Sequence, residues 1–233
     1  MVRRYWIILI TYIAMHLSGF IGMPALVAIL GFDLSQAVVW WNIISFIIAL
    51  IIIGVLLLPE RHEQPRIEKA GPGPVTFWII AGFFLAMFAQ ATAVFIQSSL
   101  LGIEPGSENT EQILQFIESF PIFIMVVVVI GPILEEIVFR KVLFGSLYKR
   151  MNFFWAALIS SFIFSIVHVD LENLLVYLAV GFVFAYLYVK TNRILVPIIA
   201  HVIMNLFAAL GPQFADFEEE LQFIVHLIGG VLR

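Results

Sequence analysis

Long apolar segments alternate with short polar joints along almost the whole chain. A membrane-crossing helix needs about 20 mostly apolar residues, and the apolar runs here are too long and too numerous for the core of a soluble domain. The predicted spans are 5–32, 36–58, 75–101, 120–148, 152–169, 174–189 and 194–210. The pattern therefore predicts an all-α fold, a polytopic bundle of transmembrane helices.

The joints between the spans differ in length and character. Residues 59–74 are rich in charge, Gly and Pro and are predicted to be a solvated loop. Residues 102–111 form an acidic connection, and 113–119 are predicted to be an interfacial turn before the fourth span. Near the end of the chain, 221–232 is apolar but extends only about 18 Å as a helix. It either completes an eighth crossing or lies re-entrant, so seven to eight spans are expected.

The first span has two features of its own. Its basic start, Arg3 and Arg4, precedes an apolar run that continues without a small-residue cleavage signal, so we interpret it as a retained span. Gly19, Gly22 and Pro24 fall inside it and predict a bend.

We interpret residues 1–233 as a single membrane domain in three parts. The first three spans occupy 5–110, the spans that carry polar motifs occupy 111–210, and a C-terminal segment follows at 211–233. We find no internal sequence repeat that would indicate a transporter built from two halves.

Composition agrees with the membrane interpretation and narrows the chemistry. The 233 residues are 62% hydrophobic and 12% charged, with a mean hydropathy of +1.07. Soluble domains are about 45 to 50% apolar and about 25% charged. The absence of cysteine excludes disulfides, thiolate metal ligands and a cysteine nucleophile. We expect membrane lipids as partners and no nucleic acid, and the sequence indicates no oligomeric state.

Basic residues, apart from Arg233, occur only in alternate joints. They are Arg3, Arg4, Arg61, Arg66, Lys69, Arg140, Lys141, Lys149, Arg150, Lys190 and Arg193. The opposite joints carry acidic residues alone. Because cytoplasmic loops are enriched in Lys and Arg, the pattern predicts a multi-pass cell-membrane protein with a cytoplasmic N-terminus.

Two adjacent glutamates, Glu135 and Glu136, stand inside the fourth predicted span, with Arg140 one turn further on. Each charge at the centre of a membrane helix costs roughly 2.5 to 3.5 kcal/mol, so the three would cost about 8 kcal/mol without compensation. Glu136 and Arg140 are four residues apart, in the favourable order for an ion pair. Glu135 points about 100° away and has no such partner. Ion pairing within the helix therefore does not account for the free-energy cost of placing Glu135 in the membrane.

Three further polar side chains lie at overlapping depth in two other predicted spans. His168 belongs to the fifth span, and His201 and Asn205 face one side of the seventh because they are four residues apart. Counted from the basic helix ends, Glu135 and His168 lie about 20 and 24 Å deep. His201 and Asn205 lie about 11 and 17 Å deep. A carboxylate, two imidazoles and an amide suffice for water activation and oxyanion stabilisation.

Each of these groups also has a structural interpretation. Glu135 could be a protonated carboxyl bonded to backbone, and a membrane histidine or Asn205 could be a hydrogen-bonding strut between helices. Because several polar types converge at one depth, we favour a shared site. For His16 and His226 we keep the structural interpretation.

Three motifs in separate spans carry a family resemblance. E-E-x-x-x-R at 135–140, F-x-x-x-H at 164–168 and H-x-x-x-N/D at 201–205 resemble, in this order, the motifs of the CPBP family. That family comprises CAAX-type prenyl proteases and bacteriocin-processing or immunity proteins, also called Abi proteins. The set is specific and covers about 120–210. One departure is Lys141, where many members have Gly directly after the arginine.

The resemblance implies a glutamate-dependent intramembrane endopeptidase. It assigns Glu135 as the general base that activates water, with His168 assisting. It assigns His201 and Asn205 to the oxyanion of the tetrahedral intermediate. The supporting residues are Glu136, Arg140 and Phe164.

The sequence is compatible with a zinc-dependent mechanism and with a metal-free one. Glu135, His168 and His201 could provide one carboxylate and two imidazoles to zinc, which leaves a fourth position for water. No H-E-x-x-H motif is present, however, so we favour a mechanism without a cofactor.

Three classes of function follow from these residues. We favour an endopeptidase acting on membrane-associated peptides or proteins, either prenylated CAAX-type peptides or leader and pheromone peptides. The alternatives are a membrane scaffold or bacteriocin-immunity protein that keeps the motifs for folding or partner binding, and a transporter that depends on the same carboxylate.

Overall fold

The computed structural model describes residues 2–62 and 69–211, and it contains helices and no strand among them. In chain order the helices are α1 (Arg3–Leu17), α2 (Gly19–Leu30), α3 (Leu34–Leu57), η1 (Leu58–His62), α4 (Pro72–Leu101), α5 (Glu108–Ser119), a span of several segments (Pro121–Leu147), α8 (Phe153–Val167), α9 (Leu174–Thr191) and a last helix (Leu195–Gly211). The predicted all-α membrane fold is therefore confirmed. The segment predicted at 221–232 lies outside the described residues.

The first predicted span is bent, as its glycines and proline indicated. α1 and α2 meet at 42°. The break falls at Ser18, whose hydroxyl accepts a hydrogen bond from the Trp41 indole at 3.0 Å and donates to the Met15 carbonyl at 2.6 Å. Gly22 packs so closely on Trp41 that a Cβ there would overlap the indole ring. The bend is thus fixed by contacts with α3 near the helix break.

Helix lengths support part of the predicted span count. Four helices in the described residues are long and apolar enough to cross a membrane, or up to five if α1 and α2 count as one bent span. α8 and the last helix are apolar but shorter, with 15 residues in α8. A 15-residue helix is about 22 Å long, less than the roughly 30 Å of a hydrocarbon core. The count of seven to eight spans, and the cytoplasmic N-terminus, stay predictions.

Two joints differ from their predicted form. The turn expected at 113–119 is part of a longer helix, α5, because Ser107 caps its N-terminus by accepting a hydrogen bond from the Thr110 N–H at 3.1 Å. The solvated loop expected at 59–74 is shorter, since η1 continues α3 to His62 and α4 begins at Pro72. Proline fits the first turn of a helix, where its missing N–H would have no partner.

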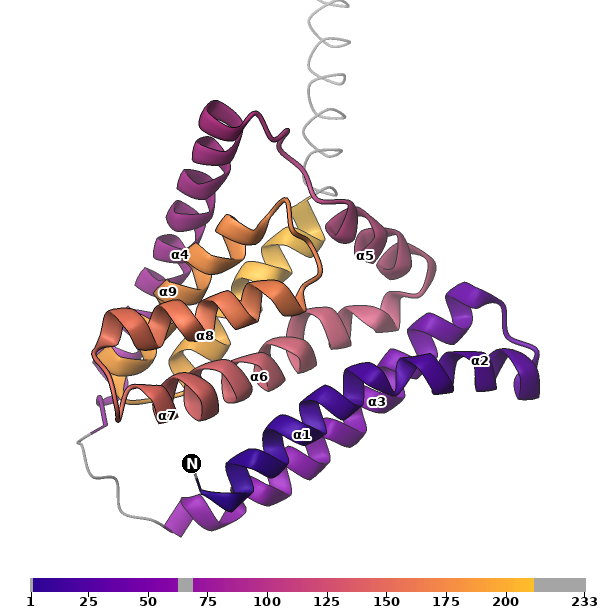
Figure 1. Cartoon of the computed structure of the whole chain (residues 1–233), viewed down its shortest axis with the longest axis horizontal. Helices are drawn as coiled ribbons and strands as arrows, with labels where there is room; N and C mark the ends of the chain where they lie inside the picture. The colour runs from indigo at the N-terminus through magenta and orange to yellow at the C-terminus, as the bar shows by residue number, and fades with distance from the viewer. Residues whose placement is uncertain (1, 63–68, 212–233) are drawn as a thin grey trace, which may run out of the picture.

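The span Pro121–Leu147 is the centre of the bundle. In its most apolar window 56% of the residues are buried, against 17 to 33% in the other long spans. Figure 1 shows α6 (Gly131–Glu135) and α7 (Gly145–Leu147), within this span, running between the α1–α3 pair and the α8–α9 pair. Buried side chains from α1, α3 and α8 pack against it in one continuous cluster. This is the span that carries both glutamates.

Small residues allow the helices of this bundle to approach closely, since lipid provides no hydrophobic force to drive helix association. Gly181 in α9 faces Ser161 in α8, and a Cβ at Gly181 would lie 2.6 Å from the Ser161 Cβ and Oγ. We therefore expect Gly181→Ala to destabilise the protein by about 1 to 3 kcal/mol through overpacking. Thermal unfolding in detergent measures this loss.

A second substitution and a control make the packing prediction specific. Ser161→Gly added to Gly181→Ala should recover part of the loss, because it removes the atoms that clash. Gly54→Ala in α3 should cause no loss, since nothing lies within 4 Å of a Cβ at that position and Ala favours a helix more than Gly does. Equal losses for Gly181→Ala and Gly54→Ala would contradict the close approach.

Candidate active site

The central span is not a regular α-helix. Its α-helical segment α6 (Gly131–Glu135) is flanked by two π-helical segments, η3 (Met125–Ile130) and η4 (Glu136–Phe144), and α7 (Gly145–Leu147) completes it. Two carbonyls in the π-helical segments accept hydrogen bonds from neighbouring helices. Asn205 Nδ2 donates to the Val127 carbonyl at 3.0 Å, and Ser160 Oγ donates to the Phe139 carbonyl at 2.7 Å. Such π-helical turns are frequent at functional sites.

Glu136 is the buried hub of the polar cluster. Its Oε2 lies 3.1 Å from Arg140 Nε, so the predicted ion pair is present, and neither side chain is exposed. Its Oε1 lies 3.1 Å from His201 Nδ1. The sequence indicated the first contact and not the second. Glu136 therefore joins the central span to the last helix.

Aromatic rings enclose the arginine on its other sides. The Arg140 guanidinium lies over the Phe164 ring at 4.5 Å and over the Phe184 ring at 5.7 Å. Ring faces attract a desolvated cation. Phe164, the first residue of the F-x-x-x-H motif, thus packs against the charge that holds Glu136.

Glu135 occupies a different environment from its neighbour. Its side chain is 18% exposed, and its Oε2 lies 3.9 Å from His201 Nε2. That distance is too long for a hydrogen bond. Glu135 is therefore the more accessible and less restrained of the two carboxylates, next to a histidine from another helix.

His168 lies at the end of α8, with its ring fixed by local groups. Its Nδ1 is 2.8 Å from the Phe164 carbonyl, and its ring stacks on Tyr177 of α9 with centroids 4.1 Å apart. The Phe164 ring stands beside both site histidines, with centroid distances of 4.5 Å to His168 and 6.3 Å to His201.

The Nδ1 partners give the two histidines different chemistry. A carbonyl can only accept, so Nδ1 of His168 carries the proton, and in the neutral ring Nε2 is left as an acceptor. His201 instead donates from Nδ1 to the Glu136 carboxylate, and its Nε2 donates as well when both ring nitrogens carry a hydrogen. His168 is thus suited to accept a proton, and His201 to donate a hydrogen bond from Nε2.

The predicted site residues come together to different degrees. Glu135, Glu136, Arg140 and His201 form one cluster. His168 lies beside this cluster, because its ring contacts the Phe164 ring, which also packs against Arg140 and His201. Asn205 is bonded to the Val127 carbonyl, eight residues before Glu135 in the span, and lies further along the last helix than His201.

Two residues of the first span also lie near the site. Tyr12 is buried, packs its ring against Phe139 at 5.6 Å and interacts electrostatically with both glutamates. His16, interpreted from the sequence as a strut, interacts electrostatically with Glu135 and His168. Its position in the sequence could have indicated this location. His16 lies about 18 Å from the basic end of its helix, a depth similar to that of the other polar groups of the site.

Lys141, the departure from the family motif, has a structural role here. Its Nζ lies 2.6 Å from Glu60 Oε2, and Arg4 Nε lies 3.2 Å from the other oxygen of Glu60. These contacts join the beginning of α1, η1 and the central span at the basic side of the bundle. The lysine charge is therefore compensated within the protein.

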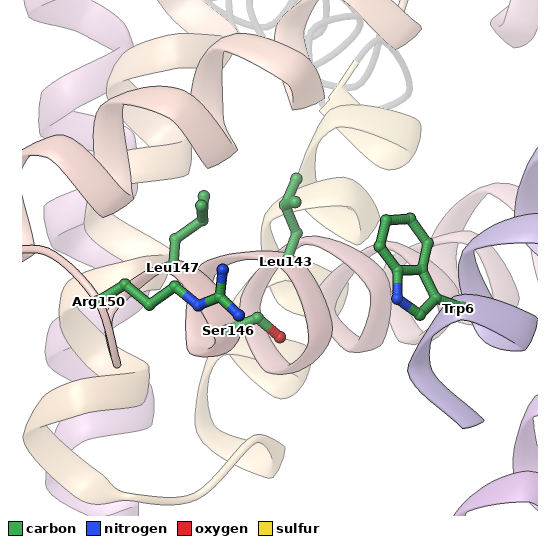
Figure 2. A pocket seen from close by; sticks show the side chains of 5 residues that line it. All are labelled: Trp6, Leu143, Ser146, Leu147 and Arg150. Atoms are coloured by element: carbon green, nitrogen blue, oxygen red, sulfur yellow. The ribbon is translucent and has the colours of Figure 1, made fainter. Parts of the chain in front are cut away.

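A separate pocket of about 130 Å³ lies at that same end of the bundle. Figure 2 shows it between Trp6 of α1 and the side chains of Leu143, Ser146, Leu147 and Arg150. None of the five lining residues belongs to the cluster of Glu135, Glu136, Arg140 and His201. The pocket is therefore distinct from the glutamate cluster.

The side chains as placed do not form a metal site. Among residues 2–62 and 69–211, no three His, Asp or Glu side chains are grouped closely enough to hold a metal ion. We derive no catalytic step through zinc.

A protein-family comparison matches the part of the chain that carries these residues. The model of the family described as type II CAAX prenyl endopeptidase Rce1-like matches residues 117–207. The match begins in α5 and ends in the last helix, so it includes all three motifs.

Three curated proteins are similar over longer stretches. "Putative membrane peptidase YdiL" of Bacillus subtilis (strain 168) is 43% identical over 241 aligned positions, which cover 98% of each chain. "Membrane-embedded CAAX protease MroQ" of Staphylococcus aureus (strain USA300) is 32% identical, over 96% of this chain and 98% of its own. The UPF0177 protein YxdF of Lactococcus lactis subsp. lactis (strain IL1403) is 29% identical over 60% of this chain and 78% of its own. No solved structure matches.

Proposed function

The chain belongs to the Rce1-like family of type II CAAX prenyl endopeptidases, a family of membrane proteases, and from this premise we propose that it is a glutamate-dependent intramembrane endopeptidase. The observation that carries the proposal is the contrast between two adjacent carboxylates. Glu136 is buried between Arg140 and His201, whereas Glu135 is 18% exposed and lies 3.9 Å from His201. Glu136 therefore has a structural role, whereas Glu135 is the carboxylate that can act on a substrate.

The first step uses Glu135 as a general base. Glu135 takes a proton from water, and the water oxygen attacks the carbonyl carbon of the scissile peptide bond. His168 assists through the acceptor on Nε2, since its Nδ1 proton is donated to the Phe164 carbonyl. General-base catalysis contributes about 100- to 10,000-fold to a rate.

The second step stabilises and resolves the tetrahedral intermediate. The oxyanion accepts a hydrogen bond from His201 Nε2, while Glu136 holds the other nitrogen of that ring. Asn205 donates one amide hydrogen to Val127, and its second is available for the oxyanion. Each such donor is worth about 3 to 4 kcal/mol. The proton on Glu135 then passes to the leaving amine, and the carbon–nitrogen bond breaks.

A zinc measurement tests the metal-free form of this mechanism. We expect purified wild-type protein and a His168→Ala, His201→Ala double variant to contain the same small amount of zinc. Inductively coupled plasma mass spectrometry measures it. Stoichiometric zinc in the wild type that is lost in the double variant would require a metal mechanism instead.

Substrates are proposed to be membrane-associated peptides or proteins, because the reactive carboxylate stands within an apolar span. The name of one relative points to CAAX-type peptides. Leader and pheromone peptides are the other class that we proposed from the sequence. Comparative membrane proteomics of a wild-type and a Glu135→Gln strain should reveal an uncut precursor in the variant, and its cleavage site distinguishes the two classes.

Glu118→Gln is the matched control for this experiment, since Glu118 is exposed on α5. That strain should process the precursor normally. Identical proteomes for wild type and Glu135→Gln, together with a full cellular phenotype, would favour the scaffold or immunity alternative. Solute uptake lost in Glu135→Gln would favour a transporter.

A further inference from the structure

His168 follows the end of α8 (Phe153–Val167), where the regular helix no longer determines its position. Two groups restrain its ring. The Phe164 carbonyl accepts the Nδ1 hydrogen at 2.8 Å, and the Tyr177 ring lies at 4.1 Å with only 29° between the planes. A single hydrogen bond still allows the imidazole to rotate about it, whereas a stacked ring restricts the plane. The two contacts together direct Nε2.

Tyr177 is itself anchored through its hydroxyl. The hydroxyl donates to Asp170 Oδ2 at 3.3 Å. Asp170 also accepts from Ser107 Oγ at 2.7 Å and from Asn173 Nδ2 at 3.1 Å. Asn173 Nδ2 lies 2.8 Å from the Gly106 carbonyl as well, which ties the segment before α5 to this hub.

The chain reaches this arrangement through a strained turn. Val169, directly after His168, has a φ of 54°, a left-handed conformation that is unfavourable for a β-branched residue. Strained conformations persist only where the surrounding contacts fix them. Here the turn allows Asp170 to meet Tyr177, while His168 keeps its contact with the same ring.

We propose that Tyr177 is a positioning residue for His168, with its ring fixing the imidazole plane and Asp170 fixing the Tyr177 ring. The inference rests on the proposed function, in which His168 assists water activation. Neither Tyr177 nor Asp170 belongs to the three motifs. Their contribution is to hold the His168 ring in the orientation in which Nδ1 donates to the Phe164 carbonyl, and that hydrogen bond fixes the tautomer.

Three variants test this role in the purified protein, with the precursor peptide from the proteome comparison as substrate. Tyr177→Met removes the ring at similar length, Tyr177→Phe keeps the ring and removes the hydroxyl, and Tyr186→Leu is the control. Tyr186 is on the same helix but packs on Trp78 of α4 at 5.8 Å. We expect Tyr177→Met to lower kcat about 10- to 100-fold with little change in KM, since misplacing a catalytic group by 1 Å costs about 100-fold.

Conservative rescue and a spectroscopic signal separate positioning from packing. Tyr177→Phe should retain most of kcat, because the ring remains. Nitrogen NMR of histidine-labelled protein should show His168 as a single Nδ1–H tautomer in wild type, Tyr177→Phe and Tyr186→Leu, and as a mixture in Tyr177→Met. If Tyr177→Met does not fold, Tyr177→Leu provides the same test.

The results decide the two proposals separately. An unchanged kcat in Tyr177→Met overturns the positioning role, and so does a reduced kcat with an unchanged His168 tautomer. A wild-type rate retained by Glu135→Gln would overturn the proposed function instead. In that case the tautomer measurement still decides whether Tyr177 holds the ring.

Discussion

Glu135→Gln should reduce kcat for the identified precursor peptide by about 100- to 10,000-fold, the contribution of a general base. The amide has nearly the same shape as the carboxylate but cannot take a proton from water. The reason for choosing Glu135 is its position, since it is 18% exposed and 3.9 Å from His201 Nε2. Glu136 is already engaged on both oxygens, by the Arg140 ion pair on one and by His201 Nδ1 on the other. Single-turnover cleavage of the purified protein measures the effect.

Two controls make this result interpretable. Glu118→Gln, at an exposed position on α5, should cleave at the wild-type rate. The unfolding temperature of Glu135→Gln should stay close to that of the wild type, because the ionic contact that it weakens, to His201 Nε2, is a long one of 3.9 Å. Cleavage by folded Glu135→Gln at the wild-type rate would exclude Glu135 as the base.

Breaking the buried pair should produce the largest loss of stability in the protein. Arg140→Met leaves Glu136 without its cation, and Glu136→Gln leaves Arg140 as an uncompensated charge between two rings. Removing one partner of a buried ion pair costs about 3 to 5 kcal/mol. Each single variant should therefore unfold at markedly lower temperature or denaturant concentration than the wild type.

A double-mutant cycle separates the pair from ordinary packing. The Glu136→Gln, Arg140→Met double variant should lose less than the sum of the single losses, by about 0.5 to 3 kcal/mol. Lys149→Met, an exposed basic residue shortly after the same span, should change stability little. Additive losses would mean that the two charges do not stabilise each other.

Much of the fold could be predicted from the sequence because each span is a local property of the chain. A run of apolar residues requires a helix in a membrane, and the observed helix bounds lie within a few residues of most predicted spans. The interfacial turn predicted at 113–119 was wrong in its extent. Ser107 caps a helix, α5, that already begins at Glu108. The π-helical form of the central span could not be predicted, since no pattern of apolar and polar positions distinguishes it from an α-helix and the hydrogen bonds to its carbonyls come from other helices.

The candidate site could be predicted where spacing within one helix decides the contact. The Glu136–Arg140 pair follows from a spacing of four residues. The contacts of Glu136 with His201 and of His168 with Tyr177 join different helices, and helix packing alone decides them. The roles of Glu135, His168, His201 and Asn205 stay proposals that the experiments above address.

The central claim is that Glu135 is tolerated inside an apolar span because it lies beside a histidine of another helix. Solid-state NMR in lipid bilayers can measure the dipolar coupling between the labelled Glu135 carboxyl group and the ring nitrogens of His201 and His168. The account predicts a coupling to His201 that corresponds to a separation within about 6 Å, the range over which such groups interact strongly. A Glu135 carboxyl more than about 10 Å from both imidazoles, well outside that range, would contradict it.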